Sequence, residues 1–203
     1  MTGLLALLIA YLLGAIPFGY LLVRFSTGKD VRKSGSGNIG ATNVLRTTGR
    51  AAGVATLLLD IAKGYAAVWI AGRLAGQSPV WTSLAALAVM AGHAFPVFLG
   101  FKGGKAVASF VGAFLRLTPL ALACALVIFV AVVAWSRFIS LGSICAAATF
   151  PLAVWIVERA PLPALLASIV AAAFIIYRHR ENIRRLHDGA ERAFRFGAPS
   201  QPR

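Results

Sequence analysis

Residues 118–135 read TPLALACALVIFVAVVAW and contain no charged side chain. A helix of about 20 such apolar residues spans the roughly 30 Å hydrocarbon core of a bilayer. The rest of the chain has the same character, since 59% of its 203 residues are hydrophobic and its mean hydropathy is +0.81. An ordinary soluble domain is only about 45–50% apolar. The sequence therefore predicts an integral membrane protein.

Seven apolar segments follow one another along the chain, separated by Gly, Pro or basic residues. They are residues 3–24, 51–72, 80–98, 104–117, 118–135, 140–157 and 162–178. Each must be a helix, because lipid cannot hydrogen-bond to open backbone groups. We therefore expect an all-α, polytopic membrane bundle of seven transmembrane helices that forms a single domain over residues 1–203. The first segment has no Lys or Arg ahead of it, unlike a signal peptide, so we expect it to remain as a span.

The segment 104–117 is the shortest of the seven. As a helix it rises only about 21 Å, which is less than the thickness of the hydrocarbon core. It can be a short crossing, a re-entrant helix or the start of one long helix over 104–135. The distribution of charge is needed to choose among these three.

Positive charge favours seven crossings. The formal net charge is +14, which in a soluble chain would indicate nucleic acid, but here the location of the charges matters more. With seven crossings, sixteen Lys and Arg residues lie on one side of the membrane, and only Arg73, Arg116 and Arg159 lie on the other. The positive-inside rule makes the first side cytoplasmic. We therefore expect the N-terminus outside and the C-terminus in the cytoplasm.

Residues 34–49, SGSGNIGATNVLRTTG, form the first of three polar stretches on the cytoplasmic side. Closely spaced glycines let a backbone approach a ligand, and successive N–H groups can form an anion-binding nest. Ser36, Asn38 and Asn43 add neutral donors, and Arg46 adds a forked cation suited to phosphate. The stretch is a candidate phosphate-binding loop. The alternative is a flexible loop whose glycines serve only turns.

Residues 92–109, GHAFPVFLGFKGGKAVAS, form the second stretch. Its segment Phe101–Lys105 is expected to open the fourth helix, where glycines and a lysine make a natural phosphate site. The alternative is that Lys102 and Lys105 only anchor the span to anionic headgroups. The GxxxxGK[ST] spacing of a P-loop is absent. His93, taken alone, is more typical of a structural histidine than of a catalytic one.

Residues 179–191, HRENIRRLHDGAE, form the third stretch and follow the last span. His179 and Asn182 share a helix face and can point to one place. The alternative is a basic interfacial helix lying on anionic lipid. That alternative explains the arginines of the stretch better than it explains His179 and Asn182.

The remaining polar residues give weaker indications. Cys124 and Cys145 lie in apolar segments, so we expect neither a disulfide nor a metal site from them. No stretch offers a metal-ligand cluster. Asp60 and Lys63 lie in the middle of a span and can pair on one helix face. The pair can be a structural ion pair that links helices or a pair with a role in function, and the sequence does not decide between the two.

The three cytoplasmic stretches closely resemble the three motifs of the bacterial acyl-phosphate:glycerol-3-phosphate acyltransferases, the PlsY family. The resemblance covers nearly the whole chain in motif order, spacing, number of spans and length. It implies transfer of a fatty acyl group from acyl phosphate to the 1-hydroxyl of sn-glycerol 3-phosphate. The products would be lysophosphatidic acid and inorganic phosphate, in the first acylation step of bacterial phospholipid synthesis. Acyl-CoA and acyl-carrier protein would not be direct donors.

The same resemblance implies where the protein works and with what. We expect a multi-pass protein of the bacterial cytoplasmic (inner) membrane with its active site facing the cytoplasm. We expect no cofactor and no metal. The partners would be glycerol 3-phosphate, acyl phosphate and the lipid bilayer, with no nucleic acid, and the protein would be a monomer.

Matching the family's motifs residue by residue gives expected roles. The residues expected to be catalytic are Ser36, Arg46, His179 and Asn182. The residues expected to bind substrate are Asn38, Asn43, Lys102, Gly103, Gly104, Lys105 and Glu191. The sequence departs from the family pattern at Ala106, which stands where the family usually has glycine, and at Ser109 and Ala190, which stand where it often has threonine.

The identity of the general base stays open between His179 and the phosphate of the substrate itself. A covalent acyl intermediate on Ser36 is disfavoured, because no adjacent base–acid pair activates the hydroxyl. In either case the enzyme needs mainly positioning and charge stabilisation, since acyl phosphate carries a good leaving group.

Three other functions explain the sequence less completely than this one does. Acyltransferases with an HxxxxD motif are excluded, because Phe98, Arg184 and Arg192 stand five residues after the three histidines. A membrane transporter of a small phosphorylated anion is the main alternative, but transporters often show inverted repeats and broken helices near mid-bilayer. A lipid-binding scaffold would explain the basic tail and leave 34–49 unexplained.

Overall fold

The computed structural model describes residues 1–194, and within them it contains helices and no strand. In chain order the helices are α1 (Thr2–Ala15), α2 (Phe18–Thr27), α3 (Ala41–Thr48), α4 (Arg50–Leu74), α5 (Pro79–Ala94), α6 (Val107–Leu117), α7 (Pro119–Ser136), α8 (Ile139–Ala153), α9 (Leu162–Arg178) and α10 (Arg180–His187). Short 3-10 turns lie at Val31–Lys33 and Val97–Leu99, and a π-helical turn at Val154–Glu158 extends α8. The expected all-α fold is confirmed for this part of the chain.

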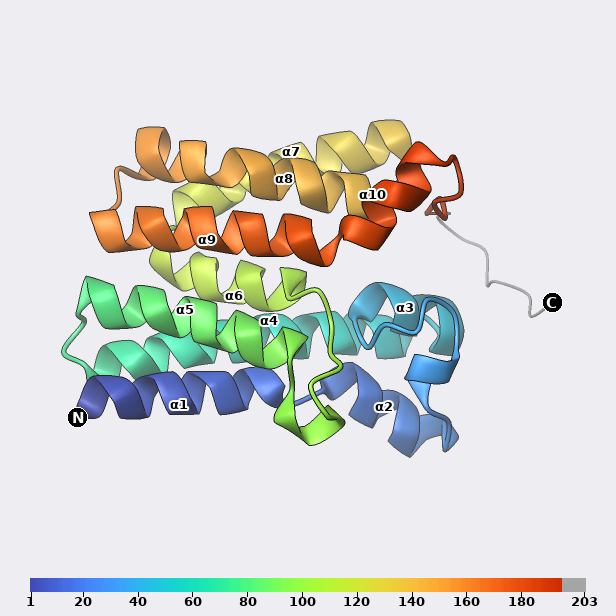
Figure 1. Cartoon of the computed structure of the whole chain (residues 1–203), viewed down its shortest axis with the longest axis horizontal. Coiled ribbons are helices and arrows are strands. Elements are labelled where there is room, and N and C mark those ends of the chain that lie inside the picture. The colour runs from blue at the N-terminus through green and yellow to red at the C-terminus, as the bar shows by residue number, and fades with distance from the viewer. Residues whose placement is uncertain (195–203) are drawn as a thin grey trace.

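The long helices lie side by side along one axis (Figure 1). The chain runs from the end that holds the N-terminus along α1, returns along α4, and then alternates through α5, α6, α7, α8 and α9. The short helices α2, α3 and α10 gather at the end opposite the N-terminus. This arrangement brings the three polar stretches of the sequence to one end of the bundle.

Length and hydropathy identify fewer spans than the seven expected. Five helical segments qualify within the described residues: Thr2–Thr27, Arg50–Leu74, Pro79–Leu99, Pro119–Ser136 and Ile139–Glu158. The α9–α10 pair, bent by 54°, adds a sixth if it is one span. Helix α6 has only 11 residues and does not qualify. Arg195 and Arg203, two of the basic residues expected on the cytoplasmic side, lie outside the described residues.

The first expected segment, 3–24, is broken at Pro17, where α1 gives way to α2. Proline cannot donate a backbone hydrogen bond, and it pushes the residue before it out of the helical region. Ile16 is accordingly extended, with ψ at 114°. Its carbonyl accepts a hydrogen bond of 2.8 Å from Lys63 on α4, so a side chain from inside the bundle satisfies the interrupted helix end.

Helix α6 is short, but its inner face is fully packed. On one side its backbone touches α4, since a Cβ on Gly112 would lie 1.8 Å from the Ile61 carbonyl oxygen. On the other side Phe110 and Phe114 each stack against Phe150 of α8, with ring centroids 4.9 Å apart. This packing holds α6 between α4 and α8, and it therefore also fixes the position of the loop that precedes α6.

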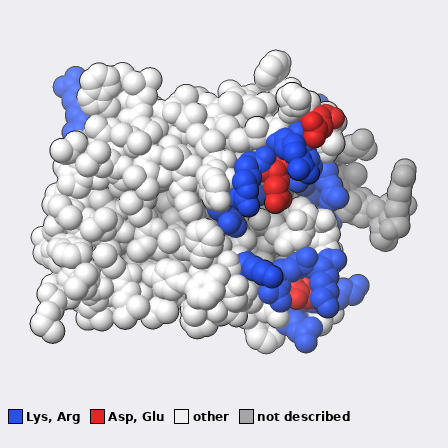
Figure 2. Space-filling model, in the orientation of Figure 1, with Lys and Arg blue, Asp and Glu red and all other residues white. Residues whose placement is uncertain are grey.

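On the face drawn in Figure 2, surface charge lies at the ends of the molecule. Figure 2 shows that nearly all the Lys, Arg, Asp and Glu side chains visible on this face lie at the end where α2, α3 and α10 meet. The long sides of the bundle expose large apolar side chains, including Leu4, Leu8, Val127 and Val130. Such a continuous apolar surface fits a lipid environment.

Candidate functional site

Asn43, on α3, organises the loop of the first polar stretch. Its side chain is 2% exposed. Its Oδ1 accepts the backbone N–H of Ser36 at 2.9 Å, and its Nδ2 donates to the carbonyls of Ser34 at 3.1 Å and Asn38 at 2.8 Å. A further contact of 3.3 Å joins Nδ2 to the Val31 carbonyl. All the polar atoms of this side chain are therefore engaged, and the loop is a fixed turn.

Two glycines make this turn possible. Gly35 and Gly37 have φ angles of 62° and 72°, a region that favours glycine. A Cβ on Gly35 would lie 2.2 Å from Asn43 Oδ1. Ser36 stands between the glycines with its side chain exposed, while its backbone is held by Asn43. The geometry presents the Ser36 hydroxyl from a rigid support.

Asn38 serves the same loop locally. Its Oδ1 accepts the backbone N–H of Gly40 at 2.8 Å, just before α3 begins. The expected substrate-binding role of Asn38 and Asn43 stays a prediction. Their side-chain hydrogen bonds go to the protein backbone, so the structure gives both a positioning role.

The glycines of the second stretch are packed against the end of α5. The Gly103 N–H donates to the Ala94 carbonyl at 3.2 Å, and the Gly104 N–H donates to the His93 carbonyl at 3.1 Å. In this structure both N–H groups are used by α5, and the expected substrate-binding role of Gly103 and Gly104 stays a prediction. A Cβ on Gly104 would lie 2.1 Å from His93 Nε2, so glycine is required here for close approach.

The segment Phe101–Lys105 does not open a helix, contrary to expectation. Helix α6 begins at Val107, and the residue before it, Ala106, has φ at 63°. This left-handed conformation favours glycine and costs an L-residue roughly 1–2 kcal/mol. The departure from the family pattern at Ala106 thus falls on a position where glycine would remove backbone strain; Phe101 in the same loop also has a positive φ, of 62°.

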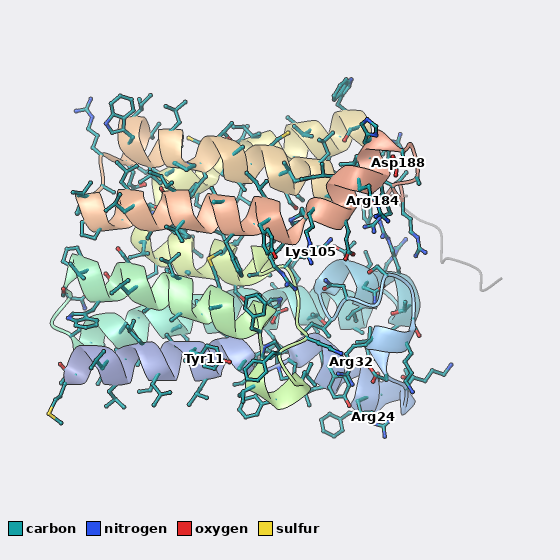
Figure 3. All side chains as sticks on the ribbon, in the orientation of Figure 1. Tyr11, Arg24, Arg32, Lys105, Arg184 and Asp188 are labelled. Carbon is teal, nitrogen blue, oxygen red and sulfur yellow. The ribbon has the colours of Figure 1, made fainter. Side chains whose placement is uncertain are left out.

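Lys105 joins the second stretch to the third. Its Nζ donates to Oδ1 of Asn182 on α10, and Asn182 Nδ2 donates to Glu191 Oε1 at 2.7 Å. Asn182 is 5% exposed. In Figure 3 Lys105 lies beside the junction of α9 and α10, whereas Arg184 and Asp188 lie farther out on α10. Burial lowers the pKa of Lys105 to about 8.

Glu191 holds Asn182 in place. Its carboxylate accepts from Ser140 Oγ at 2.7 Å, from Asn182 Nδ2 at 2.7 Å and from Arg185 Nε at 2.8 Å. Burial alone would raise the pKa of Glu191, but the donated hydrogen bonds outweigh it and hold the pKa below its usual range. Glu191 is therefore a charged anchor inside the protein, and its expected contact with substrate stays a prediction.

His179 lies at the bend between α9 and α10, just past the last residue of the span. Its side chain is 3% exposed, and Nδ1 lies 2.8 Å from the Ile175 carbonyl oxygen. A carbonyl can only accept, so Nδ1 carries the proton and Nε2 is left as an acceptor. Burial, followed by the charge of Lys105, lowers the pKa of His179 to about 4. The imidazole is neutral at pH 7.

Arg46 brings the first stretch to the same place. From α3 its Nη2 donates to the carbonyl of Arg192 at 3.2 Å. Burial, and then the charge of Arg192, lower its pKa from the ordinary value, but an arginine still remains charged at pH 7. The three stretches therefore meet where α3, the loop before α6 and α10 come together.

The structure adds residues that the sequence analysis missed and leaves one expected residue apart. Arg178 donates to the carbonyl of Gly104 at 2.8 Å and ties the second stretch to α9. Ser140 supports Glu191 from α8. Within residues 1–194, no hydrogen bond or ion pair joins the exposed Lys102 to this network. The position of Arg178 next to His179 was an available signal, whereas nothing local distinguished Ser140.

The described residues offer no metal centre. No group of three or more His, Cys, Asp or Glu side chains among residues 1–194 is arranged to hold a metal ion. Cys124 and Cys145 are free thiols within apolar helices.

Comparison with known proteins gives this arrangement a family. The family described as glycerol-3-phosphate acyltransferase matches residues 4–189. The chain belongs to the glycerol-3-phosphate acyltransferase family. A curated relative, the glycerol-3-phosphate acyltransferase of Geobacter sulfurreducens, is 51% identical over 92% of this chain and 95% of its own length.

Two solved structures share the fold. Both are crystal structures of PlsY (YgiH), an integral membrane glycerol 3-phosphate acyltransferase. The glycerol 3-phosphate form aligns with a TM-score of 0.91 at 39% identity and covers 96% of each chain. The lysophosphatidic acid form aligns with a TM-score of 0.88 at 37% identity and the same coverage. The membership implied by the three motifs is therefore confirmed over nearly the whole chain.

The Asn43→Ala variant tests whether the first loop depends on one side chain. We expect it to lose most of the activity and about 2–4 kcal/mol of stability, because Ser36 N–H and three carbonyls lose their partner at once. The matched control is Asn38→Ala, which removes only the side-chain acceptor for Gly40, and we expect it to cost about 1 kcal/mol. Thermal unfolding in detergent and turnover would be measured for both. Equal, small effects would contradict the role given to Asn43.

Proposed function

We propose that the chain transfers a fatty acyl group from acyl phosphate to the 1-hydroxyl of sn-glycerol 3-phosphate. The products are lysophosphatidic acid and inorganic phosphate, and the reaction is the first acylation of bacterial phospholipid synthesis. The observation that carries this proposal is the half-buried Lys105, whose ammonium is held by Asn182 where the three polar stretches meet. Family membership and the glycerol 3-phosphate and lysophosphatidic acid forms of the similar structures support it.

Lys105 and Arg46 are the cations that suit the phosphate groups of the substrates. Both are partly withdrawn from water: Lys105 donates to the amide oxygen of Asn182, and Arg46 donates to the backbone carbonyl of Arg192, just after the third stretch. A phosphate dianion is a stronger acceptor for a charged donor than a neutral carbonyl is. Binding of substrate would therefore exchange the neutral contact of Lys105 with Asn182 for a charged one.

A small apolar hollow of about 30 Å³ begins close to Lys105 and would have to widen to admit an acyl chain. It lies between α6, α7, α8 and α9, and its lining includes Val107, Phe110, Leu122, Ala125 and Ile175. Val107 follows Lys105 by two residues, and the carbonyl of Ile175 faces His179. A lipid that enters from the bilayer into this hollow would bring its phosphate end to the charged site.

The chemistry then requires little beyond positioning. The 1-hydroxyl of glycerol 3-phosphate attacks the acyl carbonyl, a C–O ester bond forms, and the bond between the carbonyl carbon and the phosphate oxygen breaks. Inorganic phosphate leaves with the electron pair. Ser36 and Asn182 would orient the hydroxyl and the carbonyl. A general base works best when its pKa is near the working pH, and at about 4 the pKa of His179 is low for that task. The phosphate of the substrate, with a second pKa near 6, is better matched to the role of general base near pH 7.

We also propose the orientation in the membrane. The chain would cross seven times as a single domain and a monomer, with α6 as a short crossing surrounded by protein. The charged end with α3 and α10 would face the cytoplasm of a bacterial inner membrane, and the N-terminus would lie outside. The alternation of α1, α4 and the five following helices between the two ends supports this, as does the asymmetry of basic residues.

An assay of phosphate release tests the function. Purified wild type would receive palmitoyl phosphate and glycerol 3-phosphate, with the Ser36→Ala variant beside it. We expect phosphate only when both substrates are present, together with lysophosphatidic acid, and we expect Ser36→Ala to reduce the rate at least 100-fold. If acyl phosphate is left intact while glycerol 3-phosphate still binds, the enzyme reading fails, and uptake into vesicles would test the transporter alternative.

The pH dependence tests the place given to Lys105. Its lowered pKa of about 8 means that the ammonium loses its proton as the pH rises past 8. Above pH 8 we expect kcat/KM for glycerol 3-phosphate to fall about tenfold per pH unit, because the pH dependence of kcat/KM reflects the pKa values of the free enzyme. Lys105→Arg should move the fall to higher pH, since a guanidinium does not titrate there. Lys102→Arg is the control, and it should not change the pH at which kcat/KM begins to fall. Coincident wild-type and Lys105→Arg profiles would contradict the assignment.

A further inference from the structure

Asp60, Lys63 and His93 form a buried polar cluster between α4 and α5. Their exposed fractions are 2%, 4% and 4%. Lys63 Nζ lies 2.8 Å from Asp60 Oδ1, and His93 Nδ1 lies 3.6 Å from the same oxygen. Lys63 also donates to the carbonyl of Ile16 and lies 5.6 Å from the ring centroid of Phe18. The cluster thus reaches from the break between α1 and α2 across α4 to the end of α5.

Stability alone does not explain this cluster. Charges inside an apolar bundle are costly, and replacing a buried ion pair by apolar residues of similar volume is often neutral or stabilising. The cluster is also incompletely satisfied: Asp60 Oδ1 is paired with Lys63, but His93 Nδ1 lies 3.6 Å from that oxygen and has no closer hydrogen-bond partner among the described residues. Buried polar groups of this kind are rare and call for another role.

The cluster is in direct contact with the loop that carries Lys105. The carbonyl of His93 accepts the N–H of Gly104 at 3.1 Å. The Nε2 edge of the imidazole faces this glycine, since a Cβ there would come within 2.1 Å of Nε2, 2.8 Å of Cδ2 and 3.1 Å of Cε1. The other side of the loop is held by Arg178, which donates to the Gly104 carbonyl at 2.8 Å. Gly104 therefore lies between His93 and Arg178, one residue before Lys105.

We propose that His93 is a positioning residue. Asp60 and Lys63 hold its ring in place, and the ring fixes the position of the Gly103–Gly104 segment. The position of this segment in turn places the ammonium of Lys105 where it can bind the phosphate of glycerol 3-phosphate. The ring supplies the wall against which Gly104 packs. The ion pair on α4 restrains that wall, because Asp60 faces both the ammonium and the imidazole. The inference rests on the proposed function in one respect, namely that Lys105 binds glycerol 3-phosphate.

The main test separates positioning from stability. The double variant Asp60→Leu/Lys63→Met removes both buried charges together and leaves neither one unpaired. We expect its thermal unfolding midpoint to stay close to that of wild type, its KM for glycerol 3-phosphate to rise about tenfold, and its KM for palmitoyl phosphate to change less than twofold. A misplacement of about 1 Å at a binding group is enough for an effect of this size. An unchanged KM for glycerol 3-phosphate in the folded variant would overturn the proposal.

His93→Gln provides the second variant, because it keeps a polar side chain and the backbone carbonyl while it removes the ring. We expect the same selective rise in KM for glycerol 3-phosphate. Ser83→Ala is the matched control, since Ser83 is also a buried α5 residue whose Oγ has no partner among the described residues, but it lies ten positions earlier. Ser83→Ala should leave both KM values unchanged. Equal effects of His93→Gln and Ser83→Ala would overturn the proposal.

A double-mutant cycle identifies the route of the effect. Binding of radiolabelled glycerol 3-phosphate would be measured by equilibrium dialysis for His93→Gln, Lys105→Met and the pair. If His93 acts through Lys105, His93→Gln weakens binding in the wild-type background and adds less than twofold in the Lys105→Met background. Additive losses would overturn the proposal and leave the function intact. If Lys105→Met alone leaves binding unchanged, the role of Lys105 in the proposed function fails as well.

Discussion

The hydrogen bond from Lys105 to Asn182 is the contact on which the site depends. An ammonium at the inner end of a membrane bundle has to be paired or hydrogen-bonded, because desolvation strongly disfavours the charged form. Asn182 supplies a neutral acceptor, and Glu191 fixes the orientation of its amide. A neutral partner leaves the ammonium without a direct ion pair among the described residues. The arrangement therefore keeps a cation that is partly dehydrated, immobilised and still available to an anion.

Most of the polar residues around this contact bind other parts of the protein. Asn43 shapes the loop of Ser36, Glu191 holds Asn182 and Arg185, and Arg178 holds Gly104. Electrostatic stabilisation is strongest when donors are already oriented before the reaction begins. In the proposed reaction an acyl phosphate is consumed and an ester is formed, and such a site needs this rigidity more than it needs a strong nucleophile.

The sequence alone predicted the helices more reliably than the contacts between them. The expected segment 51–72 became α4 (Arg50–Leu74), and 118–135 became α7 (Pro119–Ser136), because long uncharged runs in a membrane permit only helices. The break between α1 and α2 follows from Pro17, whose ring removes a backbone donor inside the apolar run 3–24. The roles of Asn43 and of the Gly103 and Gly104 N–H groups could not be inferred, because local composition suits both a ligand and the protein's own backbone. Arg178 meets Gly103 across 75 positions, and such pairings leave no local pattern.

The most direct test of this account is a crystal structure of the chain with glycerol 3-phosphate bound. The account predicts a phosphate oxygen about 3 Å from Lys105 Nζ, a typical distance for a charged hydrogen bond, with the ligand between α3 and α10. It would be contradicted by a phosphate held instead by Lys102 and the exposed arginines of α10, with Lys105 still bonded to Asn182 alone.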